Sequence, residues 1–207
     1  LVCAVKRKDE VIIPNGNFIL QNGDYVYITA SNKEMACAFK KFNIANEKVH
    51  SVMIIGGGKL SYYLAKMLLN SGIQVKIIDK DRAICSSLSD LLPEALVLHG
   101  DGTNQNFLLE EGLMSTDSLI TLTGIDETNI LVSTFASSLK CKKVITKVSN
   151  NNYDLILNNL GLDSVIDPKE LFASNIIRYV RGMQNSRGNE FKTLYRLVNN
   201  KVEASEF

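Results

Sequence analysis

Residues 51–81, SVMIIGGGKLSYYLAKMLLNSGIQVKIIDKD, decide the fold of this chain. An apolar run over 52–55 leads into three glycines, Gly56, Gly57 and Gly58, and a helical pattern and a second apolar run follow. The order strand, tight turn, helix and strand is the opening unit of a dinucleotide-binding fold. The stretch therefore predicts a site for an adenine nucleotide at this turn.

The glycine turn has the residue types that a bound pyrophosphate requires. Gly56 lets the chain leave the strand through a turn that most side chains forbid, and the missing side chain of Gly58 lets a pyrophosphate approach the backbone. The helix behind Gly58 offers unpaired N–H groups and a partial positive charge. Ser61 stands where the G-x-G-x-x-G pattern has its third glycine, and we expect a slightly wider helix–strand contact without loss of the site. The alternative is a glycine-rich turn that binds nothing.

Asp79 is the acidic residue that such a turn calls for. It follows the turn by roughly 20 residues and ends the second apolar run, as the dinucleotide pattern demands. Its carboxylate can accept hydrogen bonds from both ribose hydroxyls and would repel a 2′-phosphate. The pattern therefore favours NAD or a plain adenosine nucleotide over NADP.

Composition excludes several classes of function. The chain has 207 residues and a formal net charge of +1, which gives no electrostatic case for nucleic-acid binding. No apolar run approaches the roughly 18 residues needed to span a bilayer. The four cysteines have no paired spacing, which indicates neither a zinc site nor a disulfide framework and fits a reducing cytosol. Because the chain starts at Leu1 without a methionine, we expect a fragment of a longer protein.

Strand and helix patterns alternate from residue 49 to about residue 167. They predict an α/β fold: a Rossmann-like, doubly wound parallel sheet of six strands with helices on both faces. We expect strands at 52–55, 74–78, 95–99, 118–122, 143–148 and 164–167, and helices at about 61–70, 81–91, 104–111, 126–139 and 152–160.

The residues before this sheet do not follow the alternation. Residues 1–48 predict short strands with turn signals at 14–16 and 22–24. Ser31 can cap a helix over 33–42. We expect a small α+β piece that is too small for a robust core by itself.

The pattern changes again at Pro168. Residues 168–181 predict a long helix with one apolar side, which is either a dimer surface or is buried against its own domain. Residues 182–190 predict a loop. Residues 191–207 predict the start of another β-rich piece, with a turn at 199–200.

Further site candidates follow the later strands, because ligands of open α/β sheets bind outside the carboxyl ends of the strands. Asp101 and Thr103 are placed to meet an adenine or ribose edge, although an Asx turn that caps the next helix is the alternative. Thr123 and Gly124 would lie across the pyrophosphate from the glycine turn. Lys147 could reach a phosphate; a solvent-exposed lysine at a strand end is the alternative.

Other titratable residues carry less information. Asp126 and Glu127 are expected at a helix N-terminus, where carboxylates are favoured, so capping competes with a metal or interface role. His50 and His99 are isolated and have no metal-ligand spacing. No pattern of an activated nucleophile is present, so we predict no catalytic residue.

Together these residues resemble the TrkA-type regulators of bacterial potassium uptake, which are built from RCK domains. Six stretches over about 49–168 carry the resemblance: IIGGGKLSYYLA, IIDKD, LHGDGTNQNFLLEEGL, LITLTGIDETNIL, VITKV and LGLDSVIDP. VIIPNGNFILQNGDYVYI resembles the end of a smaller RCK C-subdomain, and RGMQNSRGNEFKTLYRLVNNKVEA resembles the start of another. The resemblance implies the middle of a tandem chain. Its parts would be the end of one C-subdomain (1–48), an N-domain (49–167), a crossover helix and linker (168–190) and the start of a second C-subdomain (191–207).

The resemblance also implies nucleotide contacts at matching positions. The basic residue after the fifth strand is usually arginine in the family, and Lys147 replaces it with a point charge that lacks the bidentate fork. With the candidates above, the expected cofactor-binding residues are Gly56, Gly57, Gly58, Lys59, Leu60, Ser61, Asp79, Lys80, Asp101, Thr103, Thr123, Gly124 and Lys147.

The resemblance implies regulation without turnover. NAD or NADH, with ATP or ADP as the alternative, would bind the N-domain. N-domains would pair as homodimers and assemble into a ring on the cytoplasmic face of the membrane, under a TrkH-like potassium transporter subunit. Two other functions stay open: an NAD-dependent oxidoreductase, and a regulatory domain of a cation–proton antiporter.

Overall fold

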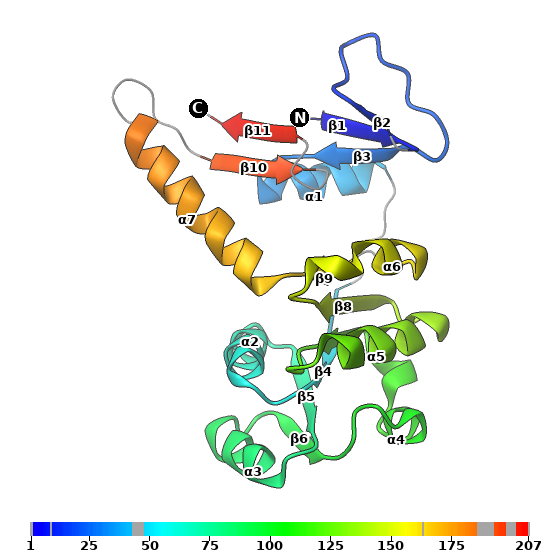
Figure 1. Ribbon diagram of the computed structural model, residues 1–207, viewed down its shortest axis with the longest axis vertical. Coiled ribbons are helices and arrows are strands. Elements are labelled where there is room, and N and C mark those ends of the chain that lie inside the picture. Colours follow the sequence, from blue (N-terminus) through cyan, green and yellow to red (C-terminus); the bar gives the residue numbers. More distant parts are fainter. Residues whose placement is uncertain are drawn as a thin grey trace. The chain divides into compact units, whose positions relative to one another are not determined.

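The computed structural model describes residues 2–8, 10–42, 48–162, 164–185, 193–197 and 202–206 (Figure 1). The chain divides into two compact units. The larger unit is Lys48–Phe172, and the smaller combines Leu1–Glu47 with Ala173–Phe207. The boundary between the units at residues 172 and 173 falls within one helix.

A parallel sheet of six strands forms the centre of the larger unit. Its strand order, β6-β5-β4-β7-β8-β9, reverses direction at β4, as in doubly wound folds, and this confirms the predicted fold class. The strands are β4 (Ser51–Ile55), β5 (Gln74–Asp79), β6 (Leu96–His99), β7 (Ser118–Thr121), β8 (Lys143–Lys147) and β9 (Val165–Ile166).

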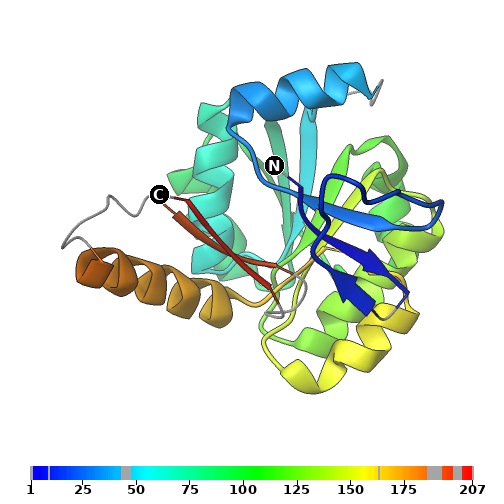
Figure 2. The ribbon, with the colours of Figure 1, turned by 90° about the horizontal axis from the view of Figure 1, so that it is seen from above.

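Helices cover both faces of this sheet, because successive residues of β4 point to opposite sides. Val52 and Ile54 pack into one apolar cluster with residues of α2 and α3, and Met53 and Ile55 pack into another with residues of α4 and α5. Figure 2 shows α2 in cyan and α5 in green on opposite sides of the strands. The helices are α2 (Lys59–Asn70), α3 (Arg82–Leu91), α4 (Gln105–Glu110), α5 (Asp126–Ser138) and α6 (Asp154–Asn159), with short 3-10 turns at Leu113–Ser115 and Asn151–Tyr153.

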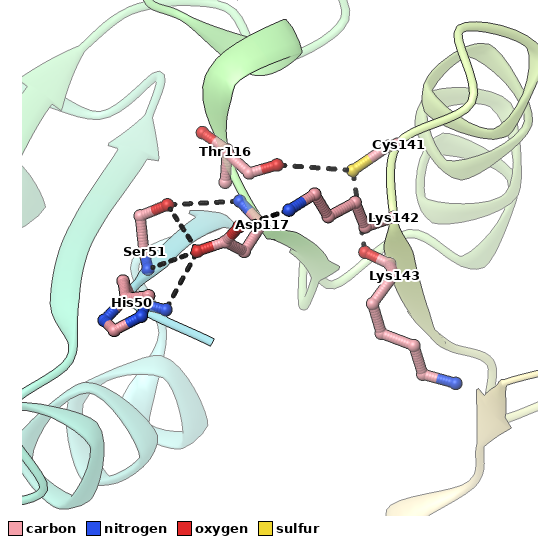
Figure 3. A network of polar contacts seen from close by, with 7 residues as sticks. All are labelled: His50, Ser51, Thr116, Asp117, Cys141, Lys142 and Lys143. Carbon is pink, nitrogen blue, oxygen red and sulfur yellow. Dashed lines mark hydrogen bonds and ion pairs between the residues drawn. The ribbon is translucent and has the colours of Figure 1, made fainter. Parts of the chain in front are cut away.

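An aspartate ties the amino edge of the sheet together (Figure 3). The Asp117 carboxylate accepts hydrogen bonds from the backbone N–H groups of His50 at 2.9 Å and Ser51 at 3.2 Å, and the N–H of Asp117 donates to the Ser51 hydroxyl at 3.1 Å. The Lys142 ammonium lies 3.3 Å from the same carboxylate. The His50 N–H and Lys142 together lower the pKa of Asp117 to about 2. These contacts join the starts of β4 and β7 at the edge opposite the glycine turn.

The smaller unit contains an antiparallel three-stranded sheet in the order β2-β1-β3, a helix that follows it, a separate two-stranded antiparallel sheet and the part of the last helix beyond residue 172. Ser31 and Glu34 form a complete capping box at the start of the helix, so the predicted cap at Ser31 is confirmed. The elements are β1 (Val2–Arg7), β2 (Glu10–Ile12), β3 (Tyr25–Ile28), α1 (Asn32–Lys41), β10 (Thr193–Leu197) and β11 (Val202–Glu206).

A bidentate ion pair holds the long connection between β2 and β3. The guanidinium of Arg7 donates to both carboxylate oxygens of Asp24 at 2.8 Å, and the Gln21 N–H donates to the same carboxylate. Arg7 thereby lowers the pKa of Asp24 to about 2. The guanidinium also lies 5.2 Å from the centre of the Phe18 ring.

The last helix, α7 (Pro168–Asn185), runs further than the sequence predicted. The loop expected over 182–190 is wrong for 182–185, because a single glycine at position 182 costs a helix only about 1 kcal/mol and does not end it. The rest of that loop, and the expected turn at 199–200, lie outside the described residues. Apolar side chains of α7 are exposed at Leu171, Phe172, Ile176, Tyr179 and Val180. Over the residues the structure describes, no helix combines the length and apolarity needed to cross a bilayer.

Candidate nucleotide-binding site

The loops that follow four neighbouring strands leave from the same edge of the sheet. Backbone hydrogen bonds continue the strand ladder into them: Gly56 N–H donates to Ile78 O at 2.8 Å, Gly100 N–H to Asp79 O at 2.9 Å, and Leu122 N–H to Ile55 O at 2.8 Å. This carboxyl edge, where the strand order reverses, is where open α/β sheets bind ligands.

Gly56 occupies a position that excludes a side chain. Its φ is +101°, and a Cβ atom there would lie 2.9 Å from the backbone nitrogen of Thr123. The turn after β4 therefore packs backbone to backbone against the loop after β7.

Gly57 and Gly58 have different surroundings. A Cβ atom at Gly57 would lie 2.7 Å from Cγ2 of Ile84 and 2.8 Å from Cδ1 of Leu88, so this glycine makes room for α3. A Cβ atom at Gly58 would meet nothing within 4 Å. Gly58 is the N-cap of α2 and has no side chain to bond the first turn, so that turn is open to an anion.

Ser61 closes the glycine turn from below. Its side chain is fully buried, and its hydroxyl donates to the Gly56 carbonyl at 2.5 Å. The residue that departs from the glycine pattern thus adds a hydrogen bond that a third glycine lacks. Lys59 and Leu60, in the same first turn of α2, are exposed.

Asp79 lies at the end of β5 and contacts the glycine turn directly. One carboxylate oxygen accepts from Gly57 N–H at 2.5 Å, and the other accepts from Asp81 N–H at 2.8 Å. An ionised carboxylate has about four acceptor sites, so these two bonds leave capacity for ribose hydroxyls. Lys80 is exposed, and its carbonyl lies 3.1 Å from Nε2 of His99.

Asp101 forms a local turn after β6. Its carboxylate accepts from both the N–H and the hydroxyl of Thr103, at 2.9 and 2.8 Å, and the Thr103 N–H lowers the pKa of Asp101. The Asx turn weighed in the sequence is present, but the cap of α4 is Asn104. Gly102 lies against Ile55, where a Cβ atom would come within 2.4 Å of Cγ2.

The loop after β7 is held by a residue that the sequence did not single out. Asn129, buried in α5, bonds the backbone N–H of Thr123 at 2.9 Å and its hydroxyl at 2.7 Å. Lys147 is half-buried, and its ammonium donates to the Thr123 carbonyl at 2.8 Å. A Cβ atom at Gly124 would meet nothing within 4 Å, so the loop beyond Thr123 borders open space. The available signal for Asn129 was a polar residue at a buried position of a helix that follows a site loop.

Asp126 and Glu127 lie in the first turn of α5, but neither caps it. The Asp126 carboxylate accepts from Ser149 N–H at 2.8 Å, and the Glu127 carboxylate accepts from the Tyr153 hydroxyl at 2.5 Å. The Tyr153 hydroxyl lowers the pKa of Glu127. Both acids therefore join α5 to the segment after β8. Across the described ranges, His, Cys, Asp and Glu form no group of three or more that could hold a metal ion.

Fold and site together define a doubly wound α/β domain with a glycine turn of the dinucleotide-binding type. The model of the TrkA-N domain family matches residues 52–168. The chain belongs to this family, which confirms the resemblance drawn from the sequence.

Curated relatives carry the same family name. The chain is 31% identical to the Trk system potassium uptake protein TrkA of Halomonas elongata, over 87% of this chain and 39% of the relative. It is 28% identical to Trk system potassium uptake protein trkA homolog 1 of Methanosarcina mazei, over 100% of this chain and 50% of the relative. The chain thus spans at most about half the length of these relatives.

Solved structures share the fold at low sequence identity. The RCK domain of GsuK matches 90% of this chain and 40% of its own, with a TM-score of 0.61 and 17% identity. The NAD(P)-binding domain of an exopolyphosphatase-related protein from Archaeoglobus fulgidus matches 65% of this chain and 98% of its own, with a TM-score of 0.56 and 17% identity. The Kef CTD of Shewanella denitrificans in AMP-bound form matches 65% of this chain and 82% of its own, with a TM-score of 0.55 and 16% identity.

Proposed function

We propose that this chain is the nucleotide-sensing part of a regulatory subunit of a Trk-type potassium uptake system. The observation that carries the proposal is the open first turn of α2 at Gly58, with the Asp79 carboxylate beside it. An N-terminal helix turn without a side-chain cap attracts phosphate. A carboxylate at the end of the next strand accepts ribose hydroxyls.

NAD or NADH is the proposed ligand, with ATP or ADP as the alternative. The pyrophosphate would lie on the N–H groups of the α2 turn, between Gly58 and the Thr123–Gly124 loop, and the adenosine ribose would bond Asp79. The negative charge of Asp79 disfavours a 2′-phosphate, and hence NADP. Two proteins of the same fold support the adenine class: one is described as an NAD(P)-binding domain, and another holds AMP.

The nucleotide would act as an effector and not as a substrate. Regulation requires that the two conformational states of the assembly bind the nucleotide with different affinity. The partner would be a membrane potassium transporter subunit, and the names of the curated relatives, which are potassium uptake proteins, support a role in potassium transport. The chain would bind this partner on the cytoplasmic side of the membrane. The exposed apolar side chains of α7 support assembly into homodimers and larger rings.

Titration of the purified chain with NADH, NAD, ATP and ADP, followed by thermal unfolding, tests the proposal. A ligand that binds only the folded state at 100 times its Kd adds about 2.7 kcal/mol to the free energy of unfolding. We expect at least one of the four nucleotides to raise the midpoint, and Asp79→Ala to reduce that rise. Asp90→Ala, which removes an exposed carboxylate of α3, is the matched control.

Three outcomes would redirect the proposal. If none of the four nucleotides moves the midpoint, the chain does not sense them. Hydride transfer between a bound nicotinamide and any substrate would favour the oxidoreductase. Co-purification of the complete protein with a cation–proton antiporter would favour the regulatory role in that transport class.

A further inference from the structure

The Asn129 side chain uses its whole hydrogen-bonding capacity across two loops. Its oxygen accepts from the N–H and the hydroxyl of Thr123, and its nitrogen donates to the carbonyls of Thr123 at 3.2 Å and Lys147 at 3.0 Å. The side chain is fully buried. A carboxamide has two N–H donors and one oxygen with two lone pairs, so no capacity is left over.

These four bonds fix one wall of the candidate site. The Thr123 nitrogen that Asn129 holds is the atom that a Cβ at Gly56 would approach to 2.9 Å. The Gly56 backbone lies too close to Thr123 to leave room for a Cβ, so a shift of Thr123 toward the glycine turn meets that backbone, and a shift away breaks the bonds to Asn129. The position of the loop after β7 relative to the glycine turn is therefore set by a residue buried in α5.

The same side chain links this wall to the end of β8. Asn129 bonds the Lys147 carbonyl, and the Lys147 ammonium returns to the Thr123 carbonyl at 2.8 Å. The position of the only basic side chain proposed for the β8 end of the site thus depends on the same amide. A buried, fully satisfied polar network holds its members in one geometry.

We propose that Asn129 is a positioning residue for the nucleotide. Its side chain holds Thr123, in the loop after β7, and Lys147 at the spacing that the bound phosphates need. The inference rests on the proposed function and adds a residue that touches no nucleotide itself. Loss of the amide would free both loops and lower affinity in molecules that remain folded.

Asn129→Ala in the full chain is the direct test, with NADH and ATP titrated separately by calorimetry below the unfolding midpoint. We expect the Kd of the nucleotide that binds the unaltered chain to rise about tenfold or more. If Asn129→Ala does not fold, Asn129→Ser, which keeps a hydroxyl near Thr123, takes the same measurement.

Ser133→Ala is the matched control, since Ser133 lies one turn further along α5 and is equally buried. Its hydroxyl is 3.0 Å from that of Thr121, so the substitution breaks a buried polar contact between α5 and the sheet without reaching either loop. We expect it to lower the unfolding midpoint but to leave the Kd within about twofold of the unaltered chain.

A measurement without any substitution completes the test. A positioning role requires the Thr123 N–H to be protected from hydrogen exchange before nucleotide arrives. Unaltered binding by folded Asn129→Ala or Asn129→Ser would overturn the inference and leave the proposed function intact, and so would a Thr123 amide that exchanges as fast as an exposed loop. If the unaltered chain binds neither nucleotide, the proposed function fails and this inference fails with it.

Discussion

At the scale of single residues, each of the three glycines and Ser61 has a different structural role in the turn. Gly56 supplies the positive φ and the close approach to Thr123, Gly57 makes room for α3, and Gly58 borders the open space where a phosphate would lie. Ser61 bonds the Gly56 carbonyl from inside the helix. The sequence pattern already separated the role of Gly56 from that of Gly58, and the structure adds the role of Gly57.

Ser61 makes a testable contribution to stability. Ser61→Ala removes one buried hydrogen bond and should lower the free energy of unfolding by about 1 kcal/mol. Ser61→Gly also removes the Cβ within a helix and should cost about 1 kcal/mol more. Urea unfolding at neutral pH measures both. If Ser61→Gly is as stable as the unaltered chain, the hydroxyl does not stabilise the turn.

Alanine should lower stability at Gly57 but nucleotide affinity at Gly58. Gly57→Ala forces a Cβ against Ile84 and Leu88, and overpacking of this kind costs about 1–3 kcal/mol. Gly58→Ala meets open space and an ordinary φ of −69°, so stability should hold, but the added methyl group should weaken nucleotide binding. Thermal unfolding and calorimetric titration of both variants separate the two effects. Equal losses of stability would contradict the division of roles.

At the scale of helices and strands, the sequence located most elements of the sheet to within one or two residues. Long buried runs such as β4 have a clear period and sharp ends, so their positions follow from local pattern. The end of α7 could not be predicted from the local pattern, because no residue near position 182 forbids a helix. The contacts of Asn129 and Lys147 with Thr123 join segments 6 and 24 residues apart in sequence and depend on the packing of α5 on the sheet, which no local pattern reports.

Asp117, which joins β4 to β7, should make stability depend on acid. Its pKa is lowered from 3.8 to about 2 in the folded chain, so the ionised form stabilises the fold above pH 4, and this contribution is lost as pH falls from about 4 to 2. Asp117→Asn keeps the shape but removes the charge. We expect the variant to unfold at a lower temperature than the unaltered chain at pH 6, and the difference to shrink below pH 4. Asp90→Asn is the control, and a difference that stays constant from pH 6 to 2 would exclude this role of Asp117.

At the scale of the whole molecule, the proposed site belongs to one unit only. All of its candidate residues lie within Lys48–Phe172, and the small sheet β1–β3 belongs to the other unit. Direct contacts with a ligand should therefore be confined to the carboxyl edge of the large sheet. The family could be assigned from the sequence because its motifs follow one another within a single continuous stretch, residues 52–168.

Hydrogen exchange of the full chain with and without NADH tests this expectation. Amides of 58–60 and of Gly124 should exchange more slowly with NADH, because the nucleotide would cover the α2 turn and the facing loop. Amides of β1 and β3 should be unaffected by direct binding. Protection confined to the small sheet would contradict a site at the glycine turn.

The hydrogen bond from Ser61 to Gly56 has a consequence for recognising other proteins of this kind. A search that demands glycine at the third position of the turn rejects this chain, although the turn is closed and its ligand side is open. Serine fits because its short side chain fills the space beneath the turn and bonds the one carbonyl there. A motif written as G-x-G-x-x-[GS] would therefore retain sequences in which serine replaces the third glycine and its hydroxyl bonds the turn.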